Sequence, residues 1–231
     1  MSFLDRFLHQ FPALNFIYTG GEEPNSSILK PIVKHGTYHV AADQGFHICQ
    51  QLNLSPDILI GDFDSVRSNN TPMKNFVNSK THLLEFQKDK DFTDTELAIR
   101  QVVSTNQNPI ILIGGGGLQA DHFMSNLITV FQTPEVRLWI TAREFIVSLD
   151  STLHIKHANN LRLSMFSFID TRVSSKGLKW ELENYAISNT QMTISNMCID
   201  DHIEIKVLQG KAIVLLYPDY NNLNQLDFYY V

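Results

Sequence analysis

Short apolar runs alternate with helical patterns along the first part of the chain. The apolar runs have the length and the Ile, Val, Leu and aromatic content of strands in a parallel sheet covered on both faces. The predicted buried strands are Asn15–Thr19, Tyr38–Ala42, Asp57–Ile60, His82–Phe86, Pro109–Ile113 and Val136–Thr141. The predicted helices between them are Gln44–Leu52, Pro72–Ser79, Thr93–Ser104 and Asp121–Phe131. This repeated order predicts an N-terminal α/β domain with a mostly parallel, doubly wound sheet.

The pattern changes near Leu149–Asn160, and no long helical pattern follows. Later apolar segments are short, alternate with polar positions and are separated by Gly, Asn and Asp. The predicted strands there are Leu161–Ile169, Lys179–Glu183, Gln191–Asn196, Ile203–Val207 and Ala212–Tyr217. Such a pattern predicts a small antiparallel β domain, either a sandwich or a barrel. We therefore expect an α/β domain over residues 1–150 and a β domain over residues 151–231.

Composition narrows the class of protein. The chain has 231 residues, of which 43% are hydrophobic and 18% charged, and this suits a globular protein with a sizeable core. Its net charge of −6 argues against general nucleic-acid binding, which needs a basic face to neutralise phosphates. Cys49 and Cys198 form no motif, so we interpret them as reduced packing residues.

The N-terminal segment lacks a basic start, a signal-length apolar run and a small-residue cleavage site. No apolar stretch approaches the roughly 20 residues that a membrane-spanning helix needs. We therefore expect a soluble, cytoplasmic protein with no membrane partner.

Aspartates follow several of the predicted strands. These residues are Asp43, Asp62, Asp64, Asp91, Asp94 and Asp121. Because the carboxyl ends of parallel strands meet at one edge of the sheet, where ligands bind, we expect these carboxylates to converge. A simpler interpretation of any one of them is a helix cap or a turn residue. Asp62 and Asp64 are the strongest pair, since alternate residues of an extended segment share a side.

Converging carboxylates repel one another. Two of them about 4 Å apart cost roughly 4 kcal/mol at an effective dielectric constant of 20. Such a site either protonates one group or recruits a cation, and all-oxygen ligands suit Mg²⁺, Mn²⁺ or Ca²⁺ better than Zn²⁺. Since Mg²⁺ commonly binds carboxylates together with substrate phosphates, the cluster indicates phosphoryl chemistry.

The glycine run Gly114–Gly117 follows an apolar strand and precedes a helix that begins near Asp121 and His122. Backbone N–H groups in such a place can hold a phosphate, although a flexible loop would have the same sequence. The run is not a P-loop, because no Lys-Ser or Lys-Thr follows it.

Several motifs together resemble the thiamin pyrophosphokinase family, in the same order and over about residues 40 to 200. They are Ala42–Gly45, Pro56–Ser65, Lys90–Asp94 followed by Glu96, Gly114–His122 with Asn126, Gly177–Leu182, and Ser195 with Asn196. The pairing of Gly-Asp-Phe-Asp-Ser with Asp-x-Thr-Asp is the most specific part.

The resemblance implies transfer of diphosphate from ATP to thiamin, giving thiamin diphosphate and AMP, with Mg²⁺ as cofactor. It also implies a homodimer with sites at the subunit interface, in which the β domain contributes to thiamin binding and dimerisation. By this resemblance Asp62, Asp64 and Asp94 hold the metal, and Asp91 or Asp94 accepts the hydroxyl proton. The expected ATP and diphosphate pocket consists of Asp43, Lys90, Asp91, Thr93, Gly114, Gly115, Gly117, Gln119, Asp121 and His122. Trp180, Ser195 and Asn196 are expected near thiamin.

Two departures from the family pattern bear on nucleotide binding. Gln119 stands where the family usually has arginine, and a neutral amide cannot replace a guanidinium charge beside phosphate. Gln44 stands where glycine is usual. The alternatives that stay open are a related diphospho- or phosphotransferase acting on another small alcohol, a non-catalytic sensor of nucleotide or thiamin diphosphate, and a structural protein with no ligand.

Other candidates have competing interpretations. Trp180 is expected either as a wall of the thiamin site or as a core residue of the β domain. His154 and His157 lack further ligands at zinc-like spacing, so we expect structural or surface roles for them. His122 adjoins Asp121 and is expected to orient that carboxylate.

Overall fold

The computed structural model describes residues 4–63, 80–87, 89, 91–117, 119–219 and 226–231. The chain divides into two compact units, one of Ala13–Ala142 and one that combines Met1–Pro12 with Arg143–Val231. The sequence prediction placed the division at residue 150 and assigned all of the N-terminal residues to the first domain. The first twelve residues instead belong with the β unit, for a reason that lies in the packing of helix α1.

Helix α1 (Asp5–His9) packs on the strand β15 (Asp227–Tyr230), which ends the chain. The ring centroids of Phe7 and Phe228 lie 5.0 Å apart, and Arg6 forms an ion pair with Asp227 at 2.9 Å. The side chain of Gln10 bonds the backbone of Tyr230 twice, since its Nε2 donates to the carbonyl and its Oε1 accepts from the amide. These contacts attach the start of the chain to the β unit.

The α/β unit contains a parallel sheet. Its strands are β1 (Asn15–Thr19), β2 (Tyr38–Ala42), β3 (Ile58–Gly61), β4 (His82–Glu85), β5 (Ile110–Gly114) and β6 (Val136–Ile140). The order across the sheet is β4-β3-β2-β1-β5-β6, and every neighbouring pair is parallel. The predicted parallel α/β domain is therefore confirmed.

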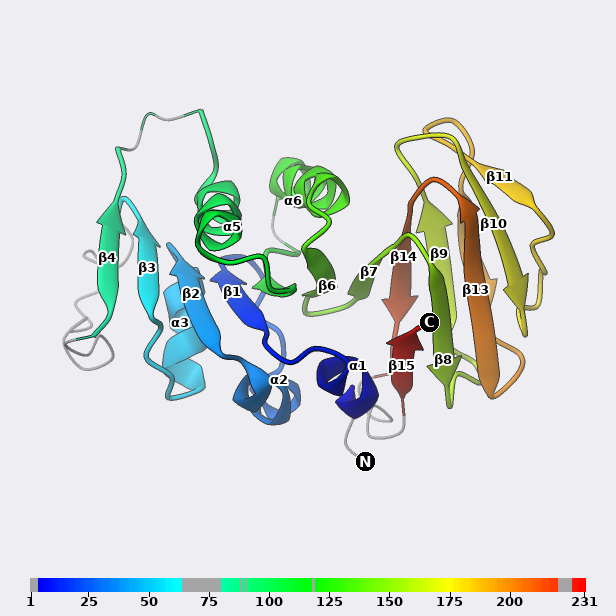
Figure 1. The fold of residues 1–231 in the computed structure, drawn as a ribbon, viewed down its shortest axis with the longest axis horizontal. Coiled ribbons are helices and arrows are strands. Elements are labelled where there is room, and N and C mark those ends of the chain that lie inside the picture. Colours follow the sequence, from blue (N-terminus) through cyan, green and yellow to red (C-terminus); the bar gives the residue numbers. More distant parts are fainter. Residues whose placement is uncertain (1–3, 64–79, 88, 90, 118, 220–225) are drawn as a thin grey trace. The chain divides into compact units, whose positions relative to one another are not determined.

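Helices lie on both sides of this sheet. They are α2 (Ser26–Ile32), the 3₁₀ turn η1 (Val33–His35), α3 (Gly45–Gln51), α5 (Asp94–Thr105) and α6 (Ala120–Gln132). Figure 1 shows α5 and α6 on one side of the sheet, and α2 and α3 on the other. This follows from right-handed crossovers, because the chain moves across the sheet in one direction from β1 to β4 and in the other from β4 through β5 to β6. In the described part of the chain, no helix has the length and apolar character needed to cross a membrane.

The helices of the α/β unit differ from the prediction at α2. The sequence reading did not predict α2, although Asn25 begins it by accepting a hydrogen bond from the amide of Ser27. The predicted helix Pro72–Ser79 lies outside the described residues.

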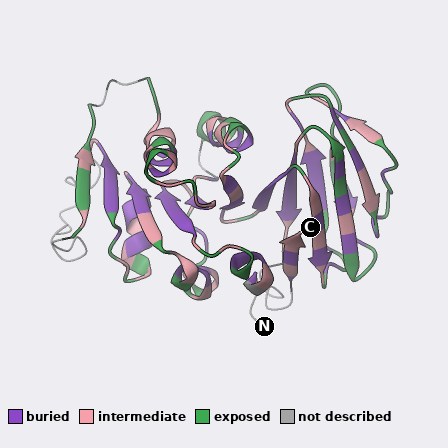
Figure 2. Ribbon diagram, in the orientation of Figure 1, coloured by how far each residue is buried: buried purple, intermediate pink, exposed green. Residues whose placement is uncertain are grey.

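Burial in the sheet falls off toward β4. All residues of β1, β3 and β5 are buried, whereas β4 is largely exposed (Figure 2). The prediction that His82–Phe86 is a buried strand is wrong in this respect. The cause is position, since β4 stands last in the strand order and has a described neighbour on one side.

The β unit contains two antiparallel sheets, as predicted. Its remaining strands are β7 (Phe145–Leu149), β8 (Thr152–Lys156), β9 (Arg162–Phe166), β10 (Thr171–Lys176), β11 (Tyr185–Ile187), β12 (Thr193–Met197), β13 (His202–Gln209) and β14 (Ala212–Tyr217). One sheet has the order β12-β9-β14-β7 and the other β11-β10-β13-β8-β15. Buried and more exposed positions alternate along β8 and the first part of β13, so one face of the second sheet contributes to the core.

The segment Lys179–Glu183 is not a strand, contrary to the prediction. It belongs to the connection between β10 and β11, where one carboxylate oxygen of Glu181 accepts bonds from the amides of Gly177 and Leu178. The other oxygen accepts the hydroxyl of Ser175. The carboxylate therefore supports a turn that begins at Gly177, whose φ of +91° favours glycine.

Candidate functional site

A cavity of about 420 Å³ opens at the carboxyl edge of the parallel sheet. This volume lies in the range of about 300 to 1,000 Å³ that is typical of small-molecule sites. Its lining is formed by Thr19, Gly20, Gly21, Ala42, Asp43, Gln44, Asp62, Phe92, Thr93, Asp94, Thr95, Gly115, Gly116, Gln119, His122 and Asn126. The loops after β1 and β5 lead to helices on opposite faces of the sheet, so the cavity lies at the topological switch point, where open α/β sheets bind ligands.

Three carboxylates reach this cavity from different parts of the chain. Asp43 follows β2, Asp62 follows β3, and Asp94 is the first residue of α5. The amide of Asp43 donates to the carbonyl of Ile60, which ties the end of β2 to β3. Asp64 lies outside the described residues. Asp91 and Asp121 are exposed and do not belong to the cavity lining.

The position of Asp94 is fixed by the start of α5. Thr93 caps the helix by accepting the amide of Glu96, while the carboxylate of Glu96 accepts the amide of Thr93. The hydroxyls of Thr19 and Thr95 share a buried hydrogen bond of 2.6 Å. The helix start is thereby joined to the end of β1, and Thr93 itself serves as a structural cap within the lining.

The glycine run is held firmly by hydrogen bonds. The carbonyls of Gly114, Gly115 and Gly116 each accept one bond, and the donors are Nε1 of Trp139, Nδ2 of Asn126 and the amide of Glu22. The amide of Gly115 donates to the carbonyl of Gly20 at 2.6 Å. That amide is therefore engaged within the protein and does not face a ligand. Gly115 and Gly116 line the cavity, whereas Gly114 and Gly117 do not.

Gln119 and His122 line the cavity at the start of α6. Gln119 is the N-cap of the helix and makes no side-chain capping bond. The carboxylate of Asp121 accepts the backbone amide of His122 at 3.0 Å, so the Asp121–His122 contact involves the histidine backbone. The two residues bring a neutral amide and an imidazole to the lining.

Among the described residues of the cavity lining, the formal charges are negative. This part of the lining contains carboxylates but neither lysine nor arginine. Lys90, which was expected here, lies outside the described residues. In the same part of the chain, no group of three or more His, Cys, Asp or Glu side chains forms a ready-made metal site.

The sequence reading missed several residues of this lining. Thr19, Gly20 and Gly21 follow the first strand, and the paired glycines after an apolar run were an available signal. Asn126 was noted in a motif but was not assigned to the site. Phe92 was missed because an aromatic residue within an acidic motif carries no distinctive pattern.

The three residues expected near thiamin lie on or beside β12 in the β unit, and the side chain of Asn196 bonds the backbone of Trp180. Its side chain accepts the amide of Trp180 at 3.2 Å and donates to the carbonyl of the same residue at 2.8 Å. Asn196 is 1% exposed, whereas the Trp180 side chain is free of the core, with 55% of the residue exposed. Ser195 is exposed, has a φ of +55°, and donates its amide to Oγ of Ser164.

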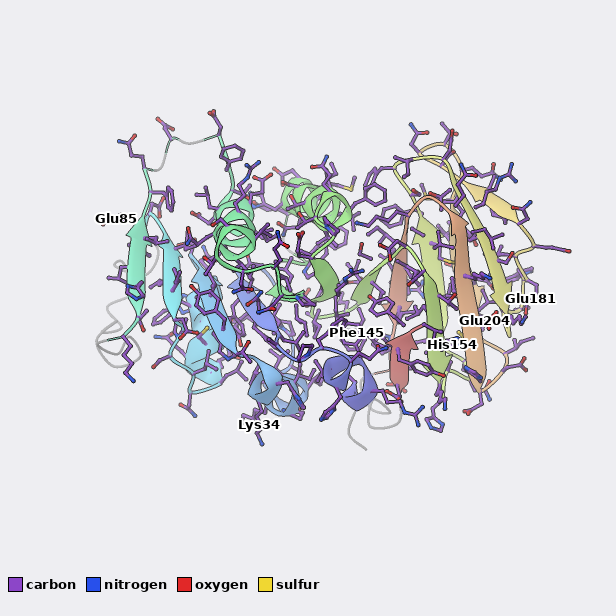
Figure 3. The ribbon with its side chains drawn as sticks, viewed as in Figure 1. Lys34, Glu85, Phe145, His154, Glu181 and Glu204 are labelled. Atoms are coloured by element: carbon purple, nitrogen blue, oxygen red, sulfur yellow. The ribbon has the colours of Figure 1, made fainter. Side chains whose placement is uncertain are left out.

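The β-unit histidines are not among the residues that line the cavity. His154 on β8 stacks on Tyr229 and bonds His202 at 3.2 Å, and it pairs in register with Glu204 on β13 (Figure 3). Partial burial lowers the pKa of His154, and the neighbouring Glu204 carboxylate opposes that shift. His157 forms an ion pair with Asp201 at 3.4 Å. These contacts agree with the surface roles expected for His154 and His157.

The fold and the cavity place the chain among α/β proteins that bind a small ligand at the carboxyl edge of a parallel sheet. Comparison with protein families is more specific. The thiamin pyrophosphokinase catalytic domain matches residues 29–140, and the thiamin pyrophosphokinase vitamin B1 binding domain matches residues 150–211. The chain belongs to the thiamin pyrophosphokinase family.

Individual relatives agree with this assignment. Thiamin pyrophosphokinase 1 of Caenorhabditis elegans is 28% identical over 149 residues, which cover 57% of this chain and 58% of that protein, less than two thirds of its length. The structure of thiamine pyrophosphokinase from Bacillus subtilis matches with a TM-score of 0.72 and 21% identity, over 90% of this chain and 99% of that one. Thiamin pyrophosphokinase from Candida albicans matches with a TM-score of 0.72 and 14% identity, over 92% and 90% of the two chains. The structural matches establish a shared fold.

Proposed function

We propose that this chain transfers diphosphate from ATP to the hydroxyl of thiamin, giving thiamin diphosphate and AMP. The observation that carries the proposal is the meeting of Asp43, Asp62 and Asp94 in one cavity of a thiamin pyrophosphokinase family member. In this reaction the thiamin hydroxyl oxygen attacks the β-phosphorus, and the bond from that phosphorus to the AMP oxygen breaks. Such transfer depends mainly on positioning and on neutralising phosphate charge.

The donor set in the cavity fits a magnesium ion. Asp62 and Asp94 supply carboxylate oxygens from neighbouring parts of the lining, and hard cations such as Mg²⁺ take oxygen ligands. Asp64 is the proposed third ligand. A bound Mg²⁺ would neutralise the negative charge that develops on the transferred phosphates.

Two helices begin beside the cavity. Asp94 opens α5 and Gln119 caps α6, and both helices exceed ten residues. Their N-termini carry partial positive charge, which favours the phosphates of a nucleotide at this edge. Because Gln119 adds no formal charge, the helix ends and the bound cation would carry more of that task.

The proton of the thiamin hydroxyl needs an acceptor. Asp94 lies in the cavity lining, whereas Asp91 is exposed and outside it. A general base must be within hydrogen-bond reach of the proton, directly or through one water. This position favours Asp94 over Asp91.

The thiamin side of the proposal involves the β unit. Trp180 presents an exposed indole, and Nζ of Lys179 lies 4.7 Å from its ring centroid. An exposed aromatic ring beside polar backbone suits a flat heterocycle. Trp180, Ser195 and Asn196 would form this part of the site, which a homodimer would complete at its interface.

The decisive measurement is AMP release from ATP, with and without thiamin and Mg²⁺. We expect AMP formation that requires both, and a panel of other hydroxyethyl heterocycles should react more slowly than thiamin. AMP formation that ignores thiamin, or that is faster with another alcohol, would contradict the assignment. Binding of thiamin diphosphate without any AMP release would favour a sensor.

Asp94→Asn and Asp91→Asn compare the two candidate bases, and kcat is measured at saturating Mg²⁺ because Asp94 is also a proposed metal ligand. We expect Asp94→Asn to lower kcat by about 10²- to 10⁴-fold, the usual contribution of a general base, and Asp91→Asn to change it less than tenfold. Asp91→Asn should keep its melting temperature within about 3 °C, because exposed substitutions rarely exceed about 0.5 kcal/mol. One carboxylate oxygen of Asp94 is buried, so the melting temperature of Asp94→Asn is measured beside its kcat. A larger loss in Asp91→Asn than in Asp94→Asn would reverse the assignment.

A further inference from the structure

Phe92 is an aromatic residue in an otherwise polar cavity. It precedes the Thr93 cap of α5, belongs to the cavity lining and is 39% exposed. Among the described lining residues it is the one phenyl ring, and most of the others are glycines or carry carboxylate, hydroxyl or amide groups. A half-exposed ring at this place has a surface available to a ligand.

Arg100 covers a face of this ring. Its guanidinium carbon lies 4.1 Å from the Phe92 ring centroid, within the range of a cation–π interaction. Arg100 lies on α5, so the helix that carries Asp94 also supports the ring. The contact fixes the orientation of Phe92 and occupies a ring face with positive charge.

We propose that Phe92, supported by Arg100, is the stacking platform for the adenine base of ATP. This inference rests on the proposed function and adds a specificity-determining residue to it. Every base has a π-face, and stacking on an aromatic side chain contributes about 1–3 kcal/mol per base.

The unit that carries the ring favours the nucleotide base over thiamin. Phe92 shares the cavity lining of the α/β unit with the carboxylates, whereas Trp180, the aromatic residue proposed for thiamin, belongs to the β unit.

The location of the ring fits this choice. Phe92 is two residues from Asp94, and Asp94 shares the lining with Asp43 and Asp62. A base stacked on Phe92 would leave its triphosphate directed toward the carboxylates and the cation that they hold. The ring would thus fix where the adenine base lies relative to the reacting phosphates.

The test compares ligands with and without a base. Dissociation constants for ATP and for inorganic tripolyphosphate are measured by calorimetry with Mg²⁺, in the wild type, Phe92→Leu and Phe92→Trp. We expect Phe92→Leu to weaken ATP binding about tenfold, which corresponds to about 1.4 kcal/mol, and to leave tripolyphosphate binding within twofold. Phe92→Trp should restore ATP binding, and the KM for thiamin should stay within twofold in both variants.

Phe86→Leu is the matched control. Phe86 is 38% exposed, follows β4 and does not line the cavity, so its loss should change neither dissociation constant. Melting temperatures verify that each variant is folded.

The possible failures are distinct. Equal binding of ATP and tripolyphosphate by the wild type, with no effect of Phe92→Leu, would overturn the platform and leave the proposed function standing. A raised KM for thiamin with unchanged ATP binding would also overturn it, since the ring would then serve the other substrate. A wild type that binds neither ligand would overturn both proposals.

Discussion

The cavity of the α/β unit and the Trp180 region of the β unit place polar residues in different ways. In the cavity, backbone groups and buried hydroxyls hold the loops from which Asp43 and Asp62 project. In the β unit, the side chain of Asn196 is itself the support, because it bonds both backbone groups of Trp180. Backbone groups and hydroxyls thus contribute the described support in the first region, whereas a side chain of the proposed site contributes it in the second.

This difference has a practical meaning for mutational studies. A loss of activity on changing a cavity carboxylate is read together with the melting temperature of the same variant, so that an effect on chemistry is separated from an effect on folding. A loss on changing Asn196 reports on folding and binding together, because an unsatisfied buried group carries its own cost.

Asn196→Leu gives the largest expected change in stability. It removes the bonds to the amide and carbonyl of Trp180 and a third bond to the amide of Met197. At about 1 kcal/mol each, the loss is about 3 kcal/mol, or roughly 6 to 12 °C in melting temperature. Thermal unfolding measures it.

Ser195→Ala is the control for that variant. The amide of Ser195 donates to Ser164, and this bond survives removal of the exposed hydroxyl. We expect a stability change below about 0.5 kcal/mol, as for most surface substitutions. Similar losses of stability in the two variants would show that Asn196 supports the fold no more than Ser195 does. The contrast between the two regions would then be wrong.

Gly115→Ala tests whether the cavity frame is as rigid as its hydrogen bonds imply. Gly115 has a φ of +74°, and an added Cβ would lie 2.7 Å from Nδ2 of Asn126 and 2.8 Å from Cγ2 of Thr19. Left-handed strain of about 1–2 kcal/mol adds to the clash, so we expect a loss of about 2 kcal/mol and weaker ATP binding. Urea unfolding and ATP calorimetry check both. Unchanged binding in a destabilised variant would mean that the glycine loop supports the fold without shaping the site.

His39 of the α/β unit is partly buried, whereas His157 and His202 of the β unit are exposed. Burial lowers the pKa of His39, Asp57 opposes the shift, and Nδ1 shares a 2.9 Å hydrogen bond with Tyr18. Because the folded pKa is below the unfolded value near 6.5, the unfolded state binds more protons as the pH falls. The stability from neutral His39 is present above pH 6.5 and is lost as the pH falls toward the folded pKa.

The size of this effect is limited to about 1.4 kcal/mol per pH unit for one group. We expect wild-type stability to fall between pH 7 and pH 5 more steeply than that of His39→Gln, measured by urea unfolding at each pH. His154→Gln is the comparison from the β unit, where burial is smaller, and its profile should lie closer to the wild type than that of His39→Gln. Parallel profiles for the wild type and His39→Gln would contradict the prediction.

Much of the α/β unit was predictable because its signals are local and its topology is regular. Apolar runs gave strands, and the rule that parallel strands share a carboxyl edge was enough to bring Asp43, Asp62 and Asp94 to one cavity. The sequence could not show that the amide of Gly115 is engaged with Gly20, since that bond joins loops 95 residues apart.

Other features were hidden for related reasons. The helix Asp5–His9 is short and acquires its role from the strand Asp227–Tyr230 at the other end of the chain. The motif indicated that Asn196 matters, but its geometry shows that the amide supports the backbone of Trp180. Residue patterns indicate which side chains are important more readily than they indicate which partner each one binds.

The junction between α1 and β15 has a consequence for synthesis on the ribosome. The chain begins in one unit, completes the strands and helices of Ala13–Ala142, and then returns to the first unit. Phe7 and Phe228 cannot meet until Phe228 has been translated, roughly 10 to 40 s after Phe7 at about 5–20 residues per second. The α/β unit can therefore fold while the apolar side chains of Phe7 and Leu8 still lack their partner strand, and this interval is where we expect chaperones to engage the nascent chain.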